Sequence, residues 1–226
     1  HNIIPGEVDM KLTLRFFSEV VYRQIKEAMV RIANGQAAAA GLPVDHIRSV
    51  ASFFVSRVDT KVDGLLAGMV DRGGARADKA ATLLGKAAIA NAKLAYAEFR
   101  EVFGSPRFEA LKAQGACAQR PLWASTGTKN RAYSDVIYVD ELVGPNTVNT
   151  VPPATLAAFL DHGQVRPGIL EEGVDEAKQQ MADLETLGVS IYTVTGELEQ
   201  EGVKSFADAF TALLNAVEAS RKKAVA

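Results

Sequence analysis

Residues 49–59 read SVASFFVSRVD, an apolar run that ends in a serine, an arginine and an aspartate. Residues 120–130 repeat the pattern, because RPLWA is followed by the polar cluster STGTKN. Each run has the length of a strand and little polar alternation, which is typical of strands covered on both faces. These two runs predict strands at about 48–56 and 120–125 of a parallel sheet.

The rest of the chain alternates further apolar runs with helical patterns. Two more strands are predicted, at 8–14 and 136–143, and residues 190–196 are expected to be short and extended. A short helix should begin near Ser105, and another should begin with proline in its first turn after residue 151. Longer helices are predicted at 18–34, 60–72, 75–102, 170–187 and 202–222. The predicted class is α/β, in a single domain over residues 1–226.

Composition excludes several classes of function. The formal net charge of −2 gives no general affinity for nucleic acid or for a membrane surface. No apolar run reaches the roughly 20 residues of a membrane span, and the N-terminus lacks a signal-peptide pattern. A single cysteine, Cys117, fits a reducing compartment, so a cytoplasmic protein is expected. Because the chain begins with His1 and not with Met, we also expect that an upstream portion is missing, with a trimmed mature N-terminus as the alternative.

Polar residues collect where the predicted strands end, and the carboxyl ends of parallel strands share one edge. Arg57 offers a planar fork, Lys129 a mobile charge, and Ser125 a hydroxyl two residues before a glycine. This combination predicts a site for a phosphate monoester. Two simpler interpretations remain open: Arg57 could pair with Asp59, and the Ser-Thr-Gly-Thr segment could be an ordinary turn.

Other catalytic patterns are weak. The three histidines lack metal-ligand spacing, and His162 is expected to cap a helix end, so no metal is predicted. Lys11 stands inside an apolar strand, on the same face as Thr13. A desolvated lysine there could form a Schiff base with a ketose, although a charged residue on an edge strand is the simpler interpretation.

Four blocks in this order resemble the longer bacterial form of transaldolase: VASFFVSRVDTKVD, GKAAIANAKLAY, QRPLWASTGTKN and YVDELVGPNTVNTVPPATL. The resemblance extends from about residue 8 to the last helix. It implies a TIM-type (β/α)8 barrel and a transferase of the pentose phosphate pathway. Such an enzyme moves a dihydroxyacetone unit between sugar phosphates through a lysine Schiff base, without a cofactor.

The resemblance also assigns roles to single residues. Ser52 and Arg57 look like a substrate-binding serine and a phosphate-binding arginine, Lys129 like a second basic phosphate ligand, and Thr13 like the threonine that positions a catalytic water. The family's lysine motif is not found, and Lys11 stands where the family has asparagine.

We therefore expect a half barrel of about four βα units, which forms homo-oligomers or associates with a missing N-terminal half. A noncatalytic half barrel that binds a sugar phosphate or a partner chain is the alternative.

Overall fold

Three parallel strands form the sheet in the computed structural model, which describes residue 45 and residues 47–225. The strands are β1 (Val50–Phe54), β2 (Arg120–Ala124) and β3 (Val148–Asn149), and β2 lies in the middle. Phe53 of β1 lies opposite Trp123, and Leu122 lies opposite Val148 of β3. The predicted parallel α/β arrangement is confirmed for this part of the chain.

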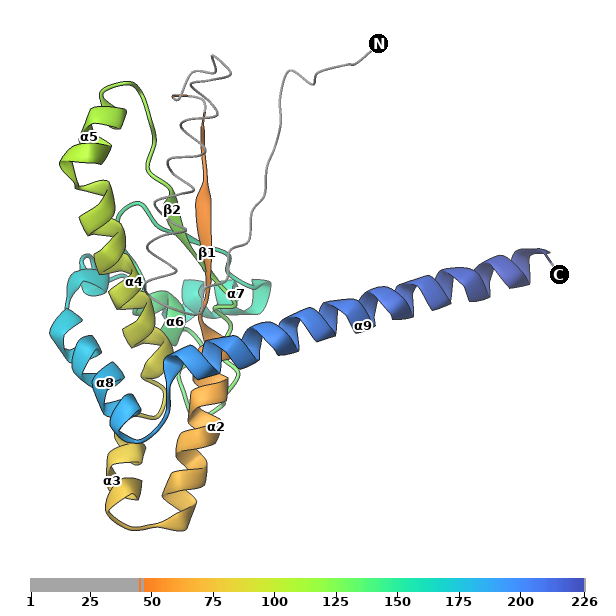
Figure 1. Cartoon of the computed structure of the whole chain (residues 1–226), viewed down its shortest axis with the longest axis horizontal. Coiled ribbons are helices and arrows are strands. Elements are labelled where there is room, and N and C mark those ends of the chain that lie inside the picture. The colour runs from red at the N-terminus through yellow and green to blue at the C-terminus, as the bar shows by residue number, and fades with distance from the viewer. Residues whose placement is uncertain (1–44, 46, 226) are drawn as a thin grey trace.

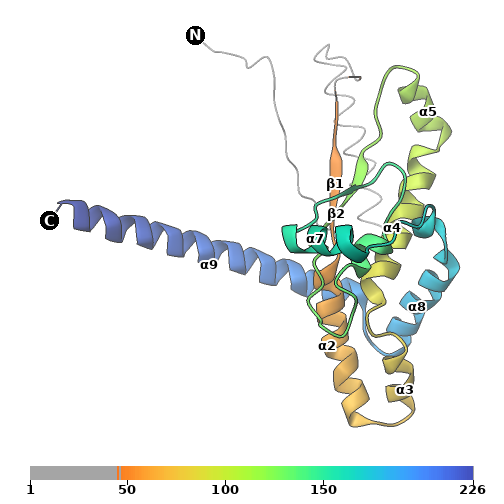
Figure 2. The same cartoon turned by 180° about the vertical axis from the view of Figure 1, so that it is seen from behind.

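A helix follows each strand, and most of the described residues lie in helices (Figure 1). They are α2 (Ser56–Arg72), α3 (Ala75–Ala81), α4 (Ala87–Phe103), α5 (Pro106–Lys112), α6 (Ile137–Asp140), α7 (Pro153–His162), the 3-10 turn η2 (Ile169–Glu171), α8 (Val174–Thr186) and α9 (Ile191–Val225). Figures 1 and 2 place α4, α5 and α8 together on one side of the sheet.

The core lies between the sheet and these helices. Trp123 is 1% exposed, meets the ring of Phe53 edge-on at 5.7 Å, and donates its indole N–H to the carbonyl of Leu142 at 3.1 Å. Leu66 of α2 and Leu184 of α8 complete the same cluster. Because side chains alternate along a strand, Val50 and Phe54 of β1 point to the other face, where they are 36% and 38% exposed.

Several predicted helix boundaries are confirmed, and others shift. Ser105 caps α5, since its hydroxyl accepts a hydrogen bond from the N–H of Phe108 at 3.3 Å, and α7 begins at Pro153. The predicted 75–102 helix is two helices. The break contains Gly85, whose φ of +71° favours glycine and whose missing Cβ would lie 2.8 Å from the ring of Tyr133.

Two predictions of extended structure are wrong. Residues 136–143 form α6 and its flanking turns, because Val136, Val139 and Leu142 are buried at a helical spacing of three, and β3 lies further along at Val148–Asn149. Residues 190–196 are also not extended. Residues 191–196 form the start of α9, which is held by the burial of Val194 in the core.

The predicted strand at 8–14 and helix at 18–34 lie outside the described residues. Within residue 45 and residues 47–225, no helix combines the length and the apolar character that crossing a membrane would need.

Candidate phosphate-binding site

The carboxyl ends of β1 and β2 stay bonded beyond the strands themselves. The N–H of Val55 donates to the carbonyl of Ala124, and the N–H of Ser56 donates to that of Ser125, both at 3.0 Å. The two serine hydroxyls also lie 2.9 Å apart, within hydrogen-bonding distance. The two segments that carry the predicted phosphate ligands are therefore joined directly.

Ser125 turns the chain at this point with a left-handed backbone, at φ of +57°. This conformation is uncommon for a residue other than glycine, and such positions cluster at functional sites. Ser56, on the other side of the contact, is 1% exposed in the first turn of α2. A buried hydroxyl thus holds the hydroxyl of a conformationally strained residue at the sheet edge.

Arg57 follows Ser56 in the first turn of α2 and is exposed. Its guanidinium carbon lies 5.6 Å from the centre of the Phe54 ring. Within the described part of the chain it forms no ion pair, and Asp59 is hydrogen-bonded to Tyr138 and Ala88 instead. The alternative in which Arg57 pairs with Asp59 is wrong.

Lys129 is exposed in the loop after β2 and forms no ion pair or hydrogen bond with the residues described. A Cβ built on Gly127 would lie 4.0 Å from the Lys129 ammonium and 3.5 Å from the Thr155 hydroxyl of α7. The same Cβ would lie 3.3 Å from the side chain of Pro152, so glycine at this position lets the loop approach the start of α7 closely.

The two threonines of the same loop have structural partners. Thr126 is fully buried and donates to the side-chain oxygen of Asn149 at 2.8 Å, which ties the loop to the end of β3. Thr128 donates to the carbonyl of Ser134 at 2.9 Å. The ordinary-turn interpretation therefore holds for these two hydroxyls, and Ser125 is the hydroxyl that contacts the end of β1.

The structure says less about the other predicted site residues. Ser52 lies in β1 opposite Leu122 and is exposed, on the strand face that alternates away from Phe53. Thr13 and Lys11 lie outside the described residues. The structure therefore brings Arg57, Ser125 and Lys129 to one edge of the sheet, whereas the roles of Ser52, Thr13 and Lys11 stay predictions.

Two carboxylates of α2 bond segments that are distant in the sequence, and the sequence pattern predicted neither set of contacts. Asp59, 2% exposed, accepts hydrogen bonds from the N–H of Ala88 and the hydroxyl of Tyr138, both at 2.7 Å. Asp63 accepts from the N–H of Gly85 at 2.9 Å and from the hydroxyl of Tyr133 at 2.8 Å. Because Tyr133 belongs to the loop that carries Lys129, Asp63 anchors that loop to α2.

Burial is the main cause of the pKa shifts of Asp59 and Tyr138. It raises the pKa of Asp59 to about 6, although the hydrogen bonds from Tyr138 and Ala88 act in the opposite direction. Burial and then the charge of Asp59 raise the pKa of Tyr138, so its hydroxyl remains a donor at neutral pH. The sequence could have indicated that Asp59 is buried, because it stands at helical spacing from the apolar residues Val55, Val62 and Leu66, which are buried.

Asp59→Asn is expected to remove the contribution of Asp59 to the pH dependence of the free energy of unfolding. Because the pKa of Asp59 is higher in the folded chain than its ordinary 3.8, its contribution is fully present below pH 3.8 and is lost as pH rises through about 6. As pH rises from below 3.8 to above 6, the free energy of unfolding of the native chain should therefore fall. The fall should be up to about 3 kcal/mol larger than that of the Asp59→Asn variant over the same pH range. Urea unfolding at several pH values measures it. Asp71→Asn, on the exposed side of α2, is the control, and parallel curves for Asp59→Asn and the native chain would contradict the assignment.

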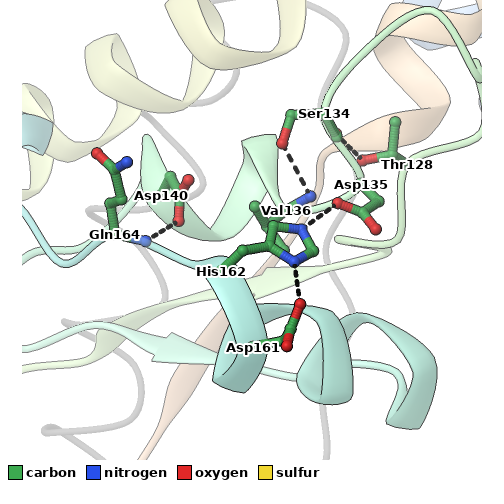
Figure 3. A network of polar contacts seen from close by, with 8 residues as sticks. All are labelled: Thr128, Ser134, Asp135, Val136, Asp140, Asp161, His162 and Gln164. Carbon is green, nitrogen blue, oxygen red and sulfur yellow. Dashed lines mark hydrogen bonds and ion pairs between the residues drawn. The ribbon is translucent and has the colours of Figure 1, made fainter.

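A second polar network joins the end of α7 to the segment after β2 (Figure 3). The ring of His162 bonds the carboxylates of Asp135 at 2.8 Å and Asp161 at 3.1 Å, and these bonds raise the pKa of the imidazole above its ordinary value. The N–H of Gln164 donates to Asp140 at 3.0 Å. The side chain of His162 thus bonds two carboxylates, in place of the predicted helix cap.

Comparison with known proteins gives the family. The family model described as Transaldolase/Fructose-6-phosphate aldolase matches residues 8–217. The chain is 45% identical over 216 residues to "Transaldolase 2" of Streptomyces coelicolor, covering 96% of this chain and 56% of that protein. It is 44% identical over 216 residues to "Transaldolase" of Mycolicibacterium smegmatis, covering 96% and 56%. "Transaldolase" of Neisseria meningitidis is 45% identical over 215 residues, covering 94% and 56%.

The chain therefore spans about half of the length of the curated relatives that it matches. The family match covers nearly all of the chain itself, in agreement with the resemblance of the four sequence blocks. The chain belongs to the transaldolase/fructose-6-phosphate aldolase family.

Proposed function

We propose that this chain is the phosphate-binding part of a transaldolase-type transferase, which moves a dihydroxyacetone unit between sugar phosphates in the pentose phosphate pathway. The contact between Ser56 and Ser125 is the observation that carries the proposal, because it joins the strand ends that Arg57 and Lys129 follow. Relatives named transaldolase support the same chemistry.

Each residue at the sheet edge has a proposed role. Arg57 would bind the phosphate with two parallel N–H groups, and Lys129 would add a mobile positive charge. Ser125 and Ser52 would supply neutral donors to the phosphate and to the substrate. The exposure of both cations supports this proposal, since neither charge is neutralised by a carboxylate of the described chain.

The Schiff-base amine is proposed to be Lys11, with Thr13 positioning a water. Lys93 is a poor candidate, because its ammonium donates to the carbonyl of Glu172 at 3.0 Å and lies 4.0 Å from the carboxylate of Glu141, among the helices. Lys86 is the residue before α4 and lies in the helical layer. Lys129 would be stabilised in its charged form by a phosphate, which opposes nucleophilic attack.

The same proposal extends to the architecture. The chain would be a single domain that supplies part of a TIM-type barrel, with further strands beside β1 or β3. The partial exposure of Val50 and Phe54 supports this, because the inner face of a barrel is normally filled by side chains of the other strands. Sugar phosphates are the proposed substrates, the cytoplasm is the proposed location, and a second copy or an N-terminal half is the proposed partner.

Borohydride reduction in the presence of fructose 6-phosphate tests the chemistry. A Schiff base reduced in place should leave a covalent adduct on the peptide that contains Lys11, detected by peptide mass mapping. Lys11→Met should abolish the adduct, whereas Lys86→Met, on the outer layer, should not. If no lysine is labelled, the chain is a noncatalytic sugar-phosphate-binding or partner-binding half barrel, and the transferase proposal fails for this chain.

A further inference from the structure

The second half of α9 leaves the rest of the molecule and extends away from it (Figures 1 and 2). We call residues 203–222 distal α9. The first half is fixed to the body, since Lys61 of α2 bonds Glu197 at 2.8 Å and Glu201 at 2.6 Å, and Val194 is buried in the core. Distal α9 has no comparable attachment among the described residues.

Distal α9 nevertheless carries a continuous apolar stripe. Its large apolar residues are all 53–69% exposed: Val203, Phe206, Phe210, Leu213, Leu214 and Val217. Five of them, at 203, 206, 210, 213 and 217, alternate steps of three and four residues, which is the spacing of a helix that packs along another helix. An exposed stripe of this kind marks an interaction surface.

Four of the other apolar residues lie symmetrically about Phe210, whereas Leu213 has Ala207 as its counterpart. Val203 and Val217 lie seven residues on either side of it, and Phe206 and Leu214 lie four residues on either side. Beyond the apolar residues, Glu199 and Arg221 each lie eleven residues away, which is about three helical turns, so both fall on the face of the stripe. One end of this face is therefore acidic and the other basic.

We infer that distal α9 binds distal α9 of a second copy of the chain, with the helices antiparallel and a two-fold axis beside Phe210. This arrangement places Val203 against Val217, Phe206 against Leu214, and Phe210 against its own counterpart, as a self-complementary two-fold interface requires.

The charges select the antiparallel direction. An antiparallel pair places Glu199 against Arg221 at both ends, whereas a parallel pair would place each charge against a like charge. Arg221 bonds Glu218 of its own helix at 2.7 Å, but both side chains are exposed, so exchanging this partner for Glu199 costs little.

Disulfide trapping tests the register in a Cys117→Ser background, because Cys117 is exposed. Phe210→Cys should oxidise to a covalent dimer, since the two residues meet at the axis. Val203→Cys is the matched control. It faces Val217 of the other copy, which places the two cysteines about 21 Å apart, too far for a disulfide. Equal or stronger trapping at Val203 would mean a parallel pair and would overturn the inference.

Light scattering and sedimentation of the 226-residue chain test the association itself. The expected mass is about twice 24.1 kDa at high concentration. Arg221→Glu should raise the dimer dissociation constant at least tenfold, and the double swap Glu199→Arg with Arg221→Glu should restore it. Circular dichroism checks that the helix persists. A monomer, or an assembly whose mass is unchanged by Arg221→Glu and by Phe210→Asp, would overturn the inference, and neither outcome depends on sugar phosphates.

Discussion

Replacing Trp123 with alanine is expected to lower the free energy of unfolding by about 3–5 kcal/mol, the range for a large aromatic side chain removed from a core. Trp123 is 1% exposed in the middle strand, between Phe53 and the helices. The substitution also leaves the buried carbonyl of Leu142 without the indole N–H that it accepts at 3.1 Å. Packing and hydrogen bonding are thus lost together.

Urea unfolding followed by circular dichroism measures this loss, because Trp123 is the only tryptophan and its fluorescence disappears with it. Trp123→Phe should lower the free energy of unfolding by less, since phenylalanine keeps much of the aromatic ring and mainly the hydrogen bond to Leu142 is lost. Leu160→Ala is the control for an apolar truncation, because Leu160 of α7 is 78% exposed and should change stability very little. A loss below about 1 kcal/mol for Trp123→Ala would show that the core can close over this position.

Arg57→Ala is expected to weaken binding of fructose 6-phosphate by about 1.5–3 kcal/mol, or roughly 10- to 150-fold, which is the range of a hydrogen bond to a charged group. Binding of fructose should change little, because it lacks the phosphate. Calorimetric titration of both sugars measures the difference. Arg57→Lys should give an intermediate loss, since it keeps the charge but not the planar fork.

Arg72→Ala is the matched control, because Arg72 is an exposed arginine at the opposite end of the same helix. It should leave both affinities unchanged. Equal losses for the phosphorylated and unphosphorylated sugars in Arg57→Ala would instead make Arg57 a structural residue, for example through its contact with Phe54.

The sequence was sufficient where local pattern determines structure. The apolar runs before Ser56 and Ser125 predicted β1 and β2, and the proline at 153 predicted the start of α7. The pattern was ambiguous at 136–143, where an apolar run with several β-branched residues suits either a strand or a short helix. The buried positions Val136, Val139 and Leu142 decide for the helix, and this burial depends on the tertiary fold.

The same distinction applies to the site. The position of Arg57 and Lys129 just after two neighbouring strand ends could be predicted, because the carboxyl ends of parallel strands meet at one edge, whereas their role as phosphate ligands stays a prediction. The partners of Asp59 and Asp63 could not, since Tyr138 and Tyr133 lie 79 and 70 residues further along the chain. Only the folded chain shows that α2 carries the exposed Arg57 close to Asp59, which bonds α4 and α6, and to Asp63, which anchors the loop after β2.

One residue, Val55, separates β1 from α2. Since each residue rotates a helix by about 100°, the length of this junction sets the rotational phase of α2 relative to the strand. Inserting or deleting one residue there would turn Asp59 away from Ala88 and Arg57 away from the sheet edge at the same time. Insertions and deletions at this junction therefore cannot alter the proposed phosphate binding without also altering the core, whereas substitutions of Arg57 alone can.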